Sequence, residues 1–218
     1  MKINKQIFII LACAVLLFFA LLNLCGSERK YLKQYLTDDS VQQLILVKQT
    51  GASKAKLRLY VKENGKWEKK IQTKAFIGKA GTGKTKEGDM KTPLGDYKFT
   101  MAFGVEEDPG SKIAYTKLTD SMYWCGDKEY YNLFVDTSKI RHKCSENSEH
   151  LIEYTKAYAY ALAIDYNKEN EWDKGSGIFL HCYGEHEYTA GCIAVPEDVM
   201  KEILCTVEQD AHICIYKW

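Results

Sequence analysis

The residues best suited to chemistry are a histidine and a cysteine close together in the C-terminal third of the chain. His181 ends a short apolar run that starts at Ile178, and Cys192 follows Gly191 just before another apolar run. A cysteine attacks a carbonyl carbon as its thiolate, and a neighbouring imidazole promotes that form by taking the thiol proton. The pair therefore predicts acyl-transfer chemistry, with Cys192 as nucleophile and His181 as general base.

An acyl-transfer site also needs hydrogen-bond donors for the developing oxyanion and a group that orients the imidazole. Gly191 has no side chain, so we expect the backbone N–H groups of Gly191 and Cys192 to approach that oxygen. A backbone carbonyl near Tyr188 or Thr189 is expected to hold the second ring nitrogen of His181. Thioester chemistry requires neither a metal nor an organic cofactor, and none is expected.

Other interpretations use the same residues. A cysteine in a strand-rich core is usually a small hydrophobe, and a histidine at a strand end usually only finds a hydrogen-bond partner. His186 lies nearer to Cys192 in the sequence and is a rival base, although its acidic neighbours indicate a solvated loop. His181, Cys182, His186 and Cys192 could bind zinc, but their spacing fits no standard ligand pattern, so no metal is expected.

A second motif points to a different activity, that of an NTPase. The segment GKAGTGKT, residues 78–85, satisfies the P-loop expression, and an apolar strand precedes it. A P-loop must open a helix whose N-terminus holds the phosphates, whereas the residues after this segment, 87–89 and 92–95, do not favour a helix. We therefore expect a glycine-rich loop here and no nucleotide site.

Apolar and alternating runs predict a strand-rich body that positions these residues. Asn64-Gly65 is the strongest short signal for a hairpin, so the fold is expected to open with antiparallel structure. Strands are expected at residues 44–48, 56–62, 66–77, 96–103, 178–181 and 212–218, with a further alternating stretch at 158–166.

A short helix is expected after the cysteine. Pro196 suits the first helical position, Glu197 and Asp198 suit the first turn, and Val199, Met200, Ile203 and Leu204 share one face. The expected fold class is mainly β (α+β).

The N-terminal part of the chain differs from this body. Lys2 and Lys5 precede an apolar run over residues 7–24, whose length favours an uncleaved membrane anchor over a cleaved signal peptide. Residues 22–26 faintly resemble a lipoprotein cleavage site, so lipidation at Cys25 is an alternative.

Three parts of the chain follow from this reading. We expect a signal-anchor, transmembrane segment at residues 1–25, a polar helical tether at 26–43, and a catalytic domain at 44–218. The expected location is the cell membrane, with a single pass and the catalytic domain on the extracytoplasmic, cell-wall side.

The composition allows one folded core and gives no sign of nucleic-acid binding. Of 218 residues, 46% are hydrophobic, and 30 Lys plus Arg against 29 Asp plus Glu leave a net charge of +1. An extracytoplasmic site permits disulfides among the eight cysteines, and the pairs to test first are Cys125 with Cys144 and Cys205 with Cys214.

Several segments occur in an order that resembles the L,D-transpeptidase (YkuD-type) catalytic domain. They are GDMKTPLGDYKF, AFG, YYN, SEHL, IDYN, GSGIFLHC and TAGCIAVP, within about Leu44 to Trp218. The family's pattern of a His, then Ser or Thr, His, Gly and Cys, maps to His181 and to residues 189–192. Ala190 replaces the second His and Ala194 stands where Arg or Asn is common, which, with a short intervening loop, indicates a divergent branch.

The resemblance implies a β-sandwich or barrel that acts on peptidoglycan peptide stems through a thioester. It implies that a terminal D-amino acid leaves and that an amine of a neighbouring stem resolves the thioester. The substrate-binding residues expected from it are Tyr183, Thr189, Trp124 and Tyr131. Two alternatives remain: an L,D-carboxypeptidase that uses water as acceptor, and a wall-binding module that has lost its activity, which Ala190 and Ala194 suggest.

Overall fold

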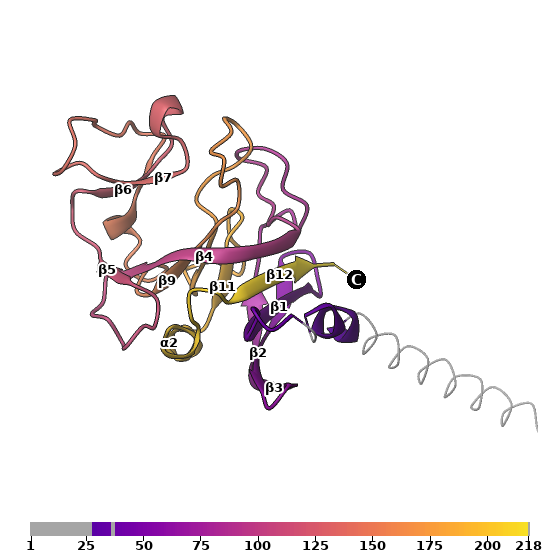
Figure 1. Ribbon diagram of the computed structural model, residues 1–218. Helices are drawn as coiled ribbons and strands as arrows, with labels where there is room; N and C mark the ends of the chain where they lie inside the picture. Colours follow the sequence, from indigo (N-terminus) through magenta and orange to yellow (C-terminus); the bar gives the residue numbers. More distant parts are fainter. Residues whose placement is uncertain (1–27, 36–37, 218) are drawn as a thin grey trace, which may run out of the picture.

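The computed structural model describes residues 28–35 and 38–217, and within them the chain is mainly β with two short α-helices (Figure 1). The first helix covers residues 28–34. The other elements are β1 (Gln43–Gln49), β2 (Lys54–Glu63), β3 (Lys66–Phe76), β4 (Gly95–Gly104), β5 (Tyr115–Lys117), β6 (Met122–Cys125), η1 (Lys128–Tyr130), β7 (Leu133–Asp136), β8 (Glu149–His150), η2 (Leu151–Glu153), β9 (Ala161–Ile164), β10 (Phe179–Cys182), β11 (Ile193–Val195), α2 (Glu197–Thr206) and β12 (His212–Tyr216).

The large sheet closes on itself as a barrel. Its strand order is β12-β1-β2-β3-β11-β10-β9-β4-β5, and a further pairing between β12 and β4 joins the two sides. The hairpin of β2 and β3 turns at Asn64 and Gly65, both with positive φ, at 51° and 71°. The strands expected from periodicity and the hairpin expected from Asn-Gly are confirmed.

Strand alternation explains why β1 is apolar on both faces. In β1, Ile45 and Val47 point into the barrel core, whereas Leu44 and Leu46 belong to an outer cluster with Tyr35. Successive side chains of a strand face opposite sides, so a strand buried on both faces must be apolar throughout. The helix at residues 28–34 therefore packs on the outside of the barrel.

The expected helix after the cysteine is α2, and it packs against the barrel core. Met200, Ile203 and Leu204 on one face of α2 join the same apolar cluster as the inward side chains of the strands. In Figure 1, α2 lies at the lower left of the barrel.

A second, three-stranded sheet of order β7-β6-β8 projects from the barrel, at the upper left of Figure 1. A separate apolar cluster joins it to the barrel, with Trp124 of β6, Phe179 of β10 and Cys192 among its members. The sequence did not predict this second sheet. The cysteine singled out above thus lies at the junction of two sheets.

The expected anchor at residues 1–25 lies outside the described residues. No helix in the part of the chain that the structure describes is long and apolar enough to cross a bilayer.

Candidate active site

The pairing of β10 with β11 places His181 and Cys192 on the same face of the barrel wall. The two strands are parallel, with Leu180 opposite Ile193 and His181 opposite Ala194. Leu180 and Ile193 point into the barrel core. Because side chains alternate along a strand, His181 and Cys192 both point outward.

These two side chains line one cleft of about 850 Å³ between the barrel and the three-stranded sheet. The barrel strands supply one wall and Trp124 and Glu149 of the small sheet contribute to the other, with Lys84 from a long loop also lining the space. A concave site with a few polar groups among apolar side chains is the usual form of a ligand site.

Cys192 is held as a neutral thiol. Its Sγ accepts a hydrogen bond from the Phe179 N–H at 3.3 Å and donates to the Gly177 carbonyl at 3.2 Å. Burial, and to a lesser extent the Glu149 carboxylate, raise the pKa of Cys192 to about 12, while the Phe179 N–H and the Lys84 ammonium act in the opposite direction. The resting nucleophile is thus protonated at neutral pH.

His181 is neutral and has one definite tautomer. Its Nδ1 lies 2.7 Å from the Cys182 carbonyl, and since a carbonyl can only accept, Nδ1 carries the proton and Nε2 has a free lone pair. Burial lowers the pKa of His181 to about 4. The prediction that a carbonyl near Tyr188 or Thr189 orients the imidazole is wrong. The carbonyl that does so belongs to Cys182 of β10, directly after the histidine.

The structure shows no hydrogen bond between the side chains of His181 and Cys192, because the thiol points to Gly177. A neutral thiol beside a neutral imidazole is a resting state in which proton transfer must accompany attack on the substrate. Hydrogen bonds of catalytic groups often tighten only when substrate binds. The arrangement can therefore perform base-assisted thiol attack once the thiol turns toward Nε2.

The backbone around Gly191 differs from the expected oxyanion pocket. The Gly191 N–H already donates to Thr189 Oγ1 at 3.1 Å, and the Thr189 hydroxyl donates to the Cys192 carbonyl at 2.7 Å. Gly191 has a steric role too, because a Cβ there would lie 3.0 Å from the Lys91 carbonyl oxygen. Thr189 lines the cleft, but its hydroxyl is committed to the turn that presents Cys192.

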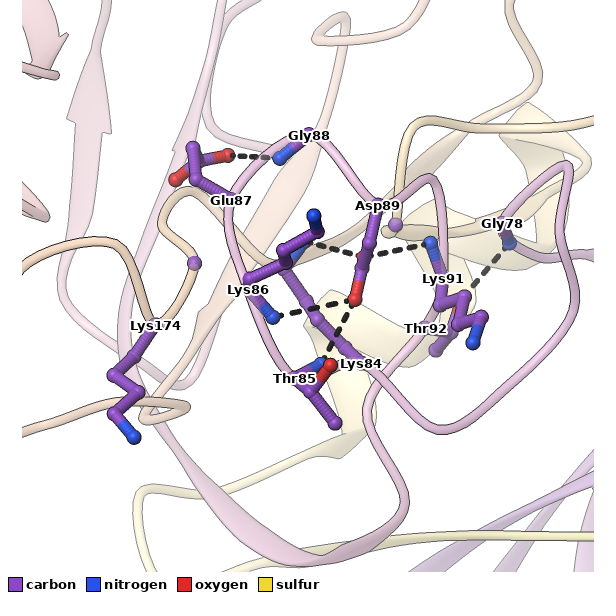
Figure 2. A network of polar contacts seen from close by, with 12 residues as sticks. Gly78, Lys84, Thr85, Lys86, Glu87, Gly88, Asp89, Lys91, Thr92 and Lys174 are labelled. Atoms are coloured by element: carbon purple, nitrogen blue, oxygen red, sulfur yellow. Dashed lines mark hydrogen bonds and ion pairs between the residues drawn. The ribbon is translucent and has the colours of Figure 1, made fainter.

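The loop that matches the P-loop expression encloses a carboxylate of its own. Asp89 accepts hydrogen bonds from the backbone N–H groups of Thr85, Lys86 and Lys91, at 2.8, 3.3 and 3.1 Å, and its Oδ1 lies 3.1 Å from Lys84 Nζ (Figure 2). Although burial acts to raise it, these bonds hold the pKa of Asp89 below its usual value.

This loop does not open a helix, because the next element of the described chain is the strand β4. Most of the donors that a P-loop would offer to phosphate are already used: the Lys84 ammonium and the Thr85 N–H bond to Asp89, and further N–H groups of the segment donate to backbone carbonyls. The expectation of a glycine-rich loop is confirmed.

Lys84 is a cleft residue that the sequence analysis missed. Its side chain is only 2% exposed and its Nζ would lie 3.8 Å from a Cβ placed on Gly191, so the ammonium is close to the turn that carries Cys192. The Lys84 charge is thus part of the electrostatic environment of the nucleophile. Its place, more than 100 positions before Cys192, left no local signal in the sequence.

Glu149 and Tyr158 form a second group that the sequence analysis did not assign to the site. The Tyr158 hydroxyl donates to Glu149 Oε1 at 2.5 Å, and the Tyr158 ring lies edge-on to His181, with 5.4 Å between ring centroids. Burial raises the pKa of Glu149 to about 7. The SEHL segment contained Glu149, but only the fold brings it beside Cys192.

Of the three aromatic residues expected to contact substrate, one lines the cleft, one lines an adjoining cavity and one lies elsewhere. Trp124 lines the cleft, where its Nε1 donates to Asn132 Oδ1 at 2.9 Å. Tyr131 lines an adjoining smaller cavity, and its hydroxyl donates to Glu87 at 2.6 Å. Tyr183 is misplaced by the prediction: it packs on Phe76 of β3 and donates to a β3 carbonyl, outside the cleft lining.

The rival interpretations of the local motif find less support. His186 is exposed on the rim of the cleft and stacks on Tyr188, with 5.0 Å between ring centroids. Cys182 points into the barrel core, away from Cys192. Across the residues that the structure describes, His181, Cys182, His186 and Cys192 do not gather as metal ligands.

The six cysteines of the described body are free thiols. The expected Cys205–Cys214 disulfide is wrong, because Cys205 is exposed on α2 and faces the Pro109 carbonyl, whereas Cys214 is buried beneath the first helix. Cys125 and Cys144 are neighbours, but as free thiols they do not form the expected disulfide.

Comparison with known structures finds the following similarities. Pgp2 of Campylobacter jejuni (K307A mutant), a helical cell shape determining protein, is 20% identical with a TM-score of 0.49, covering 82% of this chain and 48% of its own. Bd1075 of Bdellovibrio bacteriovorus is 20% identical with a TM-score of 0.45, covering 81% and 48%. An L,D-transpeptidase of Mycobacterium smegmatis is 10% identical with a TM-score of 0.39, covering 80% and 58%.

The chain thus spans about half the length of the structures it is similar to. No curated protein sequence matches it significantly. The model of the YkuD family, the L,D-transpeptidase catalytic domain, matches residues 45–213, which is most of the chain and all of the barrel except the first two residues of β1 and the last three of β12. The chain belongs to the L,D-transpeptidase (YkuD) catalytic domain family.

Proposed function

We propose that this chain is a cysteine acyltransferase that transfers peptidoglycan peptide stems, an L,D-transpeptidase. The observation that carries the proposal is the placement of His181 and Cys192 on one face of adjacent parallel strands, in one cleft. The tautomer of His181 supports it, since a base needs a free lone pair on the side of the nucleophile.

In the proposed reaction, Cys192 Sγ attacks the carbonyl carbon between the third stem residue and a terminal D-amino acid. The thiol proton passes to His181 Nε2 and then to the leaving amine, so that the carbon–nitrogen bond breaks and a thioester remains. An amine of a second stem attacks the thioester and gives its proton to His181. The sulfur leaves the carbonyl and takes that proton, which restores the neutral pair.

Lys84 supplies the positive charge that the site needs in this proposal. Ala190 and Ala194 leave no cation at the positions of the family pattern, and the Lys84 ammonium lies beside the Gly191 turn instead. A cation there lowers the pKa of Cys192 and favours the anionic transition state. The Gly191 N–H contributes to the oxyanion pocket only if Thr189 releases it.

Water could replace the second amine without any change in the nucleophile, which gives an L,D-carboxypeptidase. The test is to incubate the full chain with a disaccharide tetrapeptide and follow the products by mass spectrometry. A cross-linked dimer is expected. Tripeptide as the only product would show that the chain hydrolyses the stem and does not transfer it. Tetrapeptide that binds without being altered would support a wall-binding module.

The same proposal places the domain outside the cytoplasmic membrane, since peptide stems are found there. The support is the apolar run at residues 7–24, which lies outside the described residues. Fractionation of cells that produce the chain, with protease added to intact spheroplasts, tests this location.

A further inference from the structure

A second cluster of metal-ligand side chains lies outside the Cys192 site. Cys125 at the end of β6 meets His142 and Cys144 from the loop after β7, and one ligand atom of each lies within 4.8 Å of the others. Cys125 is fully buried, and the other two are partly buried. Within the described residues no other group of three such side chains converges in this way.

The sulfur-to-nitrogen spacing in this cluster is that of a tetrahedral zinc site. The distance from Cys125 Sγ to His142 Nε2 is 3.5 Å. Zn–S and Zn–N bonds of about 2.3 and 2.0–2.1 Å at the tetrahedral angle separate S and N by about 3.5 Å. Two thiolates and an imidazole are ligands that suit Zn²⁺ over the hard cations Mg²⁺ and Ca²⁺.

A carboxylate outside this group of three adjoins it through His142. Asp127 Oδ2 lies 3.0 Å from the same His142 Nε2, so the carboxylate and Cys125 share this nitrogen as a neighbour. Ser145 holds the carboxylate through its backbone N–H, 3.0 Å from Oδ2, and through its hydroxyl. Such outer contacts fix ligand carboxylates in metal sites.

The supporting contacts continue around the ligands. The Tyr130 ring stacks on His142, with 4.2 Å between centroids, and the Ser148 hydroxyl lies 3.6 Å from Cys125 Sγ. Gly126 is packed against the loop so closely that a Cβ would lie 2.1 Å from the Asn147 carbonyl oxygen. The loop thus lies close against the end of β6 around the cluster.

This loop, residues 137–148, has little else to order it. It contains no helix or strand, and most of its side chains are exposed. A loop of this length without secondary structure is usually either functional or disordered. Metal–ligand bonds to β6 would fix the loop in place, which its few buried apolar side chains do not.

We propose that Cys125, His142 and Cys144 bind one structural Zn²⁺ ion, with the adjoining Asp127 carboxylate turning in to complete the four ligands, and that the ion fixes the 137–148 loop to the end of β6. The loop continues into Glu146, Asn147 and Ser148, which line the cleft of Cys192. The ion therefore shapes one wall of the cleft while remaining outside the chemistry. The site is independent of the acyltransferase proposal, because zinc content is measured without substrate.

The test uses the full chain, purified in detergent under reducing conditions, with metal content measured by mass spectrometry. About one zinc ion per chain is expected, lost in Cys125→Ser and in Cys144→Ser and kept in Cys205→Ser, whose cysteine is exposed on α2. Cobalt substitution is expected to give sulfur-to-metal charge-transfer bands and the strong visible bands of a tetrahedral ion. The Asp127→Ala variant is expected to bind zinc tens-fold more weakly.

Trypsin provides a second readout that does not depend on how the protein was purified. Lys139, Arg141 and Lys143 are exposed in the loop. The zinc-loaded chain is expected to resist cleavage there, and the chelated chain to be cut.

Two results would overturn the proposal. One is zinc affinity weaker than roughly 10 μM for the reduced chain in competition with a chromophoric chelator. The other is a Cys125–Cys144 disulfide found by peptide mapping in the chain isolated without reductant from its own compartment.

Discussion

Cys182 and Cys192 are two buried thiols on neighbouring strands, and they differ in the direction in which they point. Burial raises the pKa of each to about 12. Cys182 lies in the barrel core with its Sγ 3.5 Å from the Tyr160 carbonyl, whereas Cys192 lines the cleft. Neither burial nor pKa identifies the nucleophile here. Strand alternation does, because it exposes only one of the two sulfurs to a substrate.

The largest expected effect is the loss of chemistry on removal of the Cys192 sulfur. Cys192→Ala is expected to reduce acyl transfer by more than about 10³-fold, since no other sulfur of the described residues lines the cleft. Cys182→Ala is expected to keep most of the activity and to cost about 1 kcal/mol of stability. Covalent labelling by a carbapenem, read by intact mass, checks both variants. An adduct that persists in Cys192→Ala would reverse the assignment.

The next effect concerns the base. His181→Gln keeps a donor for the Cys182 carbonyl but lacks the basic nitrogen, so a loss of about 10²- to 10⁴-fold in kcat/KM is expected. The control is His186→Gln, on the exposed rim of the same cleft, for which a change below about threefold is expected. Equal losses in the two variants would remove the distinction between them.

The pH dependence of activity follows from the same histidine. Burial lowers the pKa of His181 to about 4, so its Nε2 remains a base through the range in which an ordinary histidine, with a pKa of about 6.5, is protonated. The rate of Cys192 acylation is therefore expected to show no His181 titration between pH 5 and 7. A histidine-specific loss centred near pH 6.5, absent in His181→Gln, would contradict this expectation.

The barrel and the reacting pair were predictable because their signals are local. Alternation over β1 to β3, the Asn64-Gly65 turn and the apolar runs ending at His181 and beginning after Cys192 each act over a few residues. Neighbouring parallel strands then bring the two residues together. The placement of Tyr183 failed although alternation puts it on the same side as His181, because the residue lies just after β10, where its ring packs on Phe76 and its hydroxyl bonds to β3.

The rest of the site could not be predicted because it depends on distant segments. Lys84 belongs to a loop whose sequence matches the P-loop expression. Only the folded structure shows that its ammonium pairs with Asp89. Glu149 arrives from the small sheet, which the sequence did not reveal. Cys125 and Cys144 were considered as a disulfide, while His142, which completes the cluster, has no standard ligand spacing to either.

Glu149 distinguishes the two thiols further, because it adjoins Cys192 only. Its pKa is raised to about 7 by burial, against about 4.3 in an unfolded chain. Between these values the folded protein retains a proton that the unfolded chain has lost, so stability falls as the pH rises from about 4 to about 7 and stays at the lower level above. The expected size of this loss is about 3 kcal/mol.

Glu149→Gln is neutral at every pH and keeps an acceptor for the Tyr158 hydroxyl, so this pH-dependent loss is expected to disappear. Urea unfolding at pH 5 and pH 8 measures it. Glu146→Gln, an exposed glutamate on the same cleft, is the matched control and should retain the wild-type difference. The same wild-type difference in Glu149→Gln would show that another group causes it.

The smallest expected effect concerns the lysine charge that lies near each of the two sulfurs. Lys84 lowers the pKa of Cys192 and Lys201 lowers that of Cys182. Lys84→Met is expected to slow alkylation of Cys192 by iodoacetamide at pH 8 by about tenfold, because the thiolate loses its neighbouring cation. Lys201→Met should leave that rate unchanged.

Lys84→Met also leaves the Asp89 carboxylate without its ion-pair partner, although three backbone N–H groups still hold it. Lys84→Arg retains the charge and should restore most of the alkylation rate, while a thermal melt shows whether the loop stays folded. A slow rate in Lys84→Arg with an intact melt would mean that the shape of the lysine, and not its charge, supports the nucleophile. The electrostatic distinction between Cys192 and Cys182 would then fail, and access to the cleft alone would separate the two thiols.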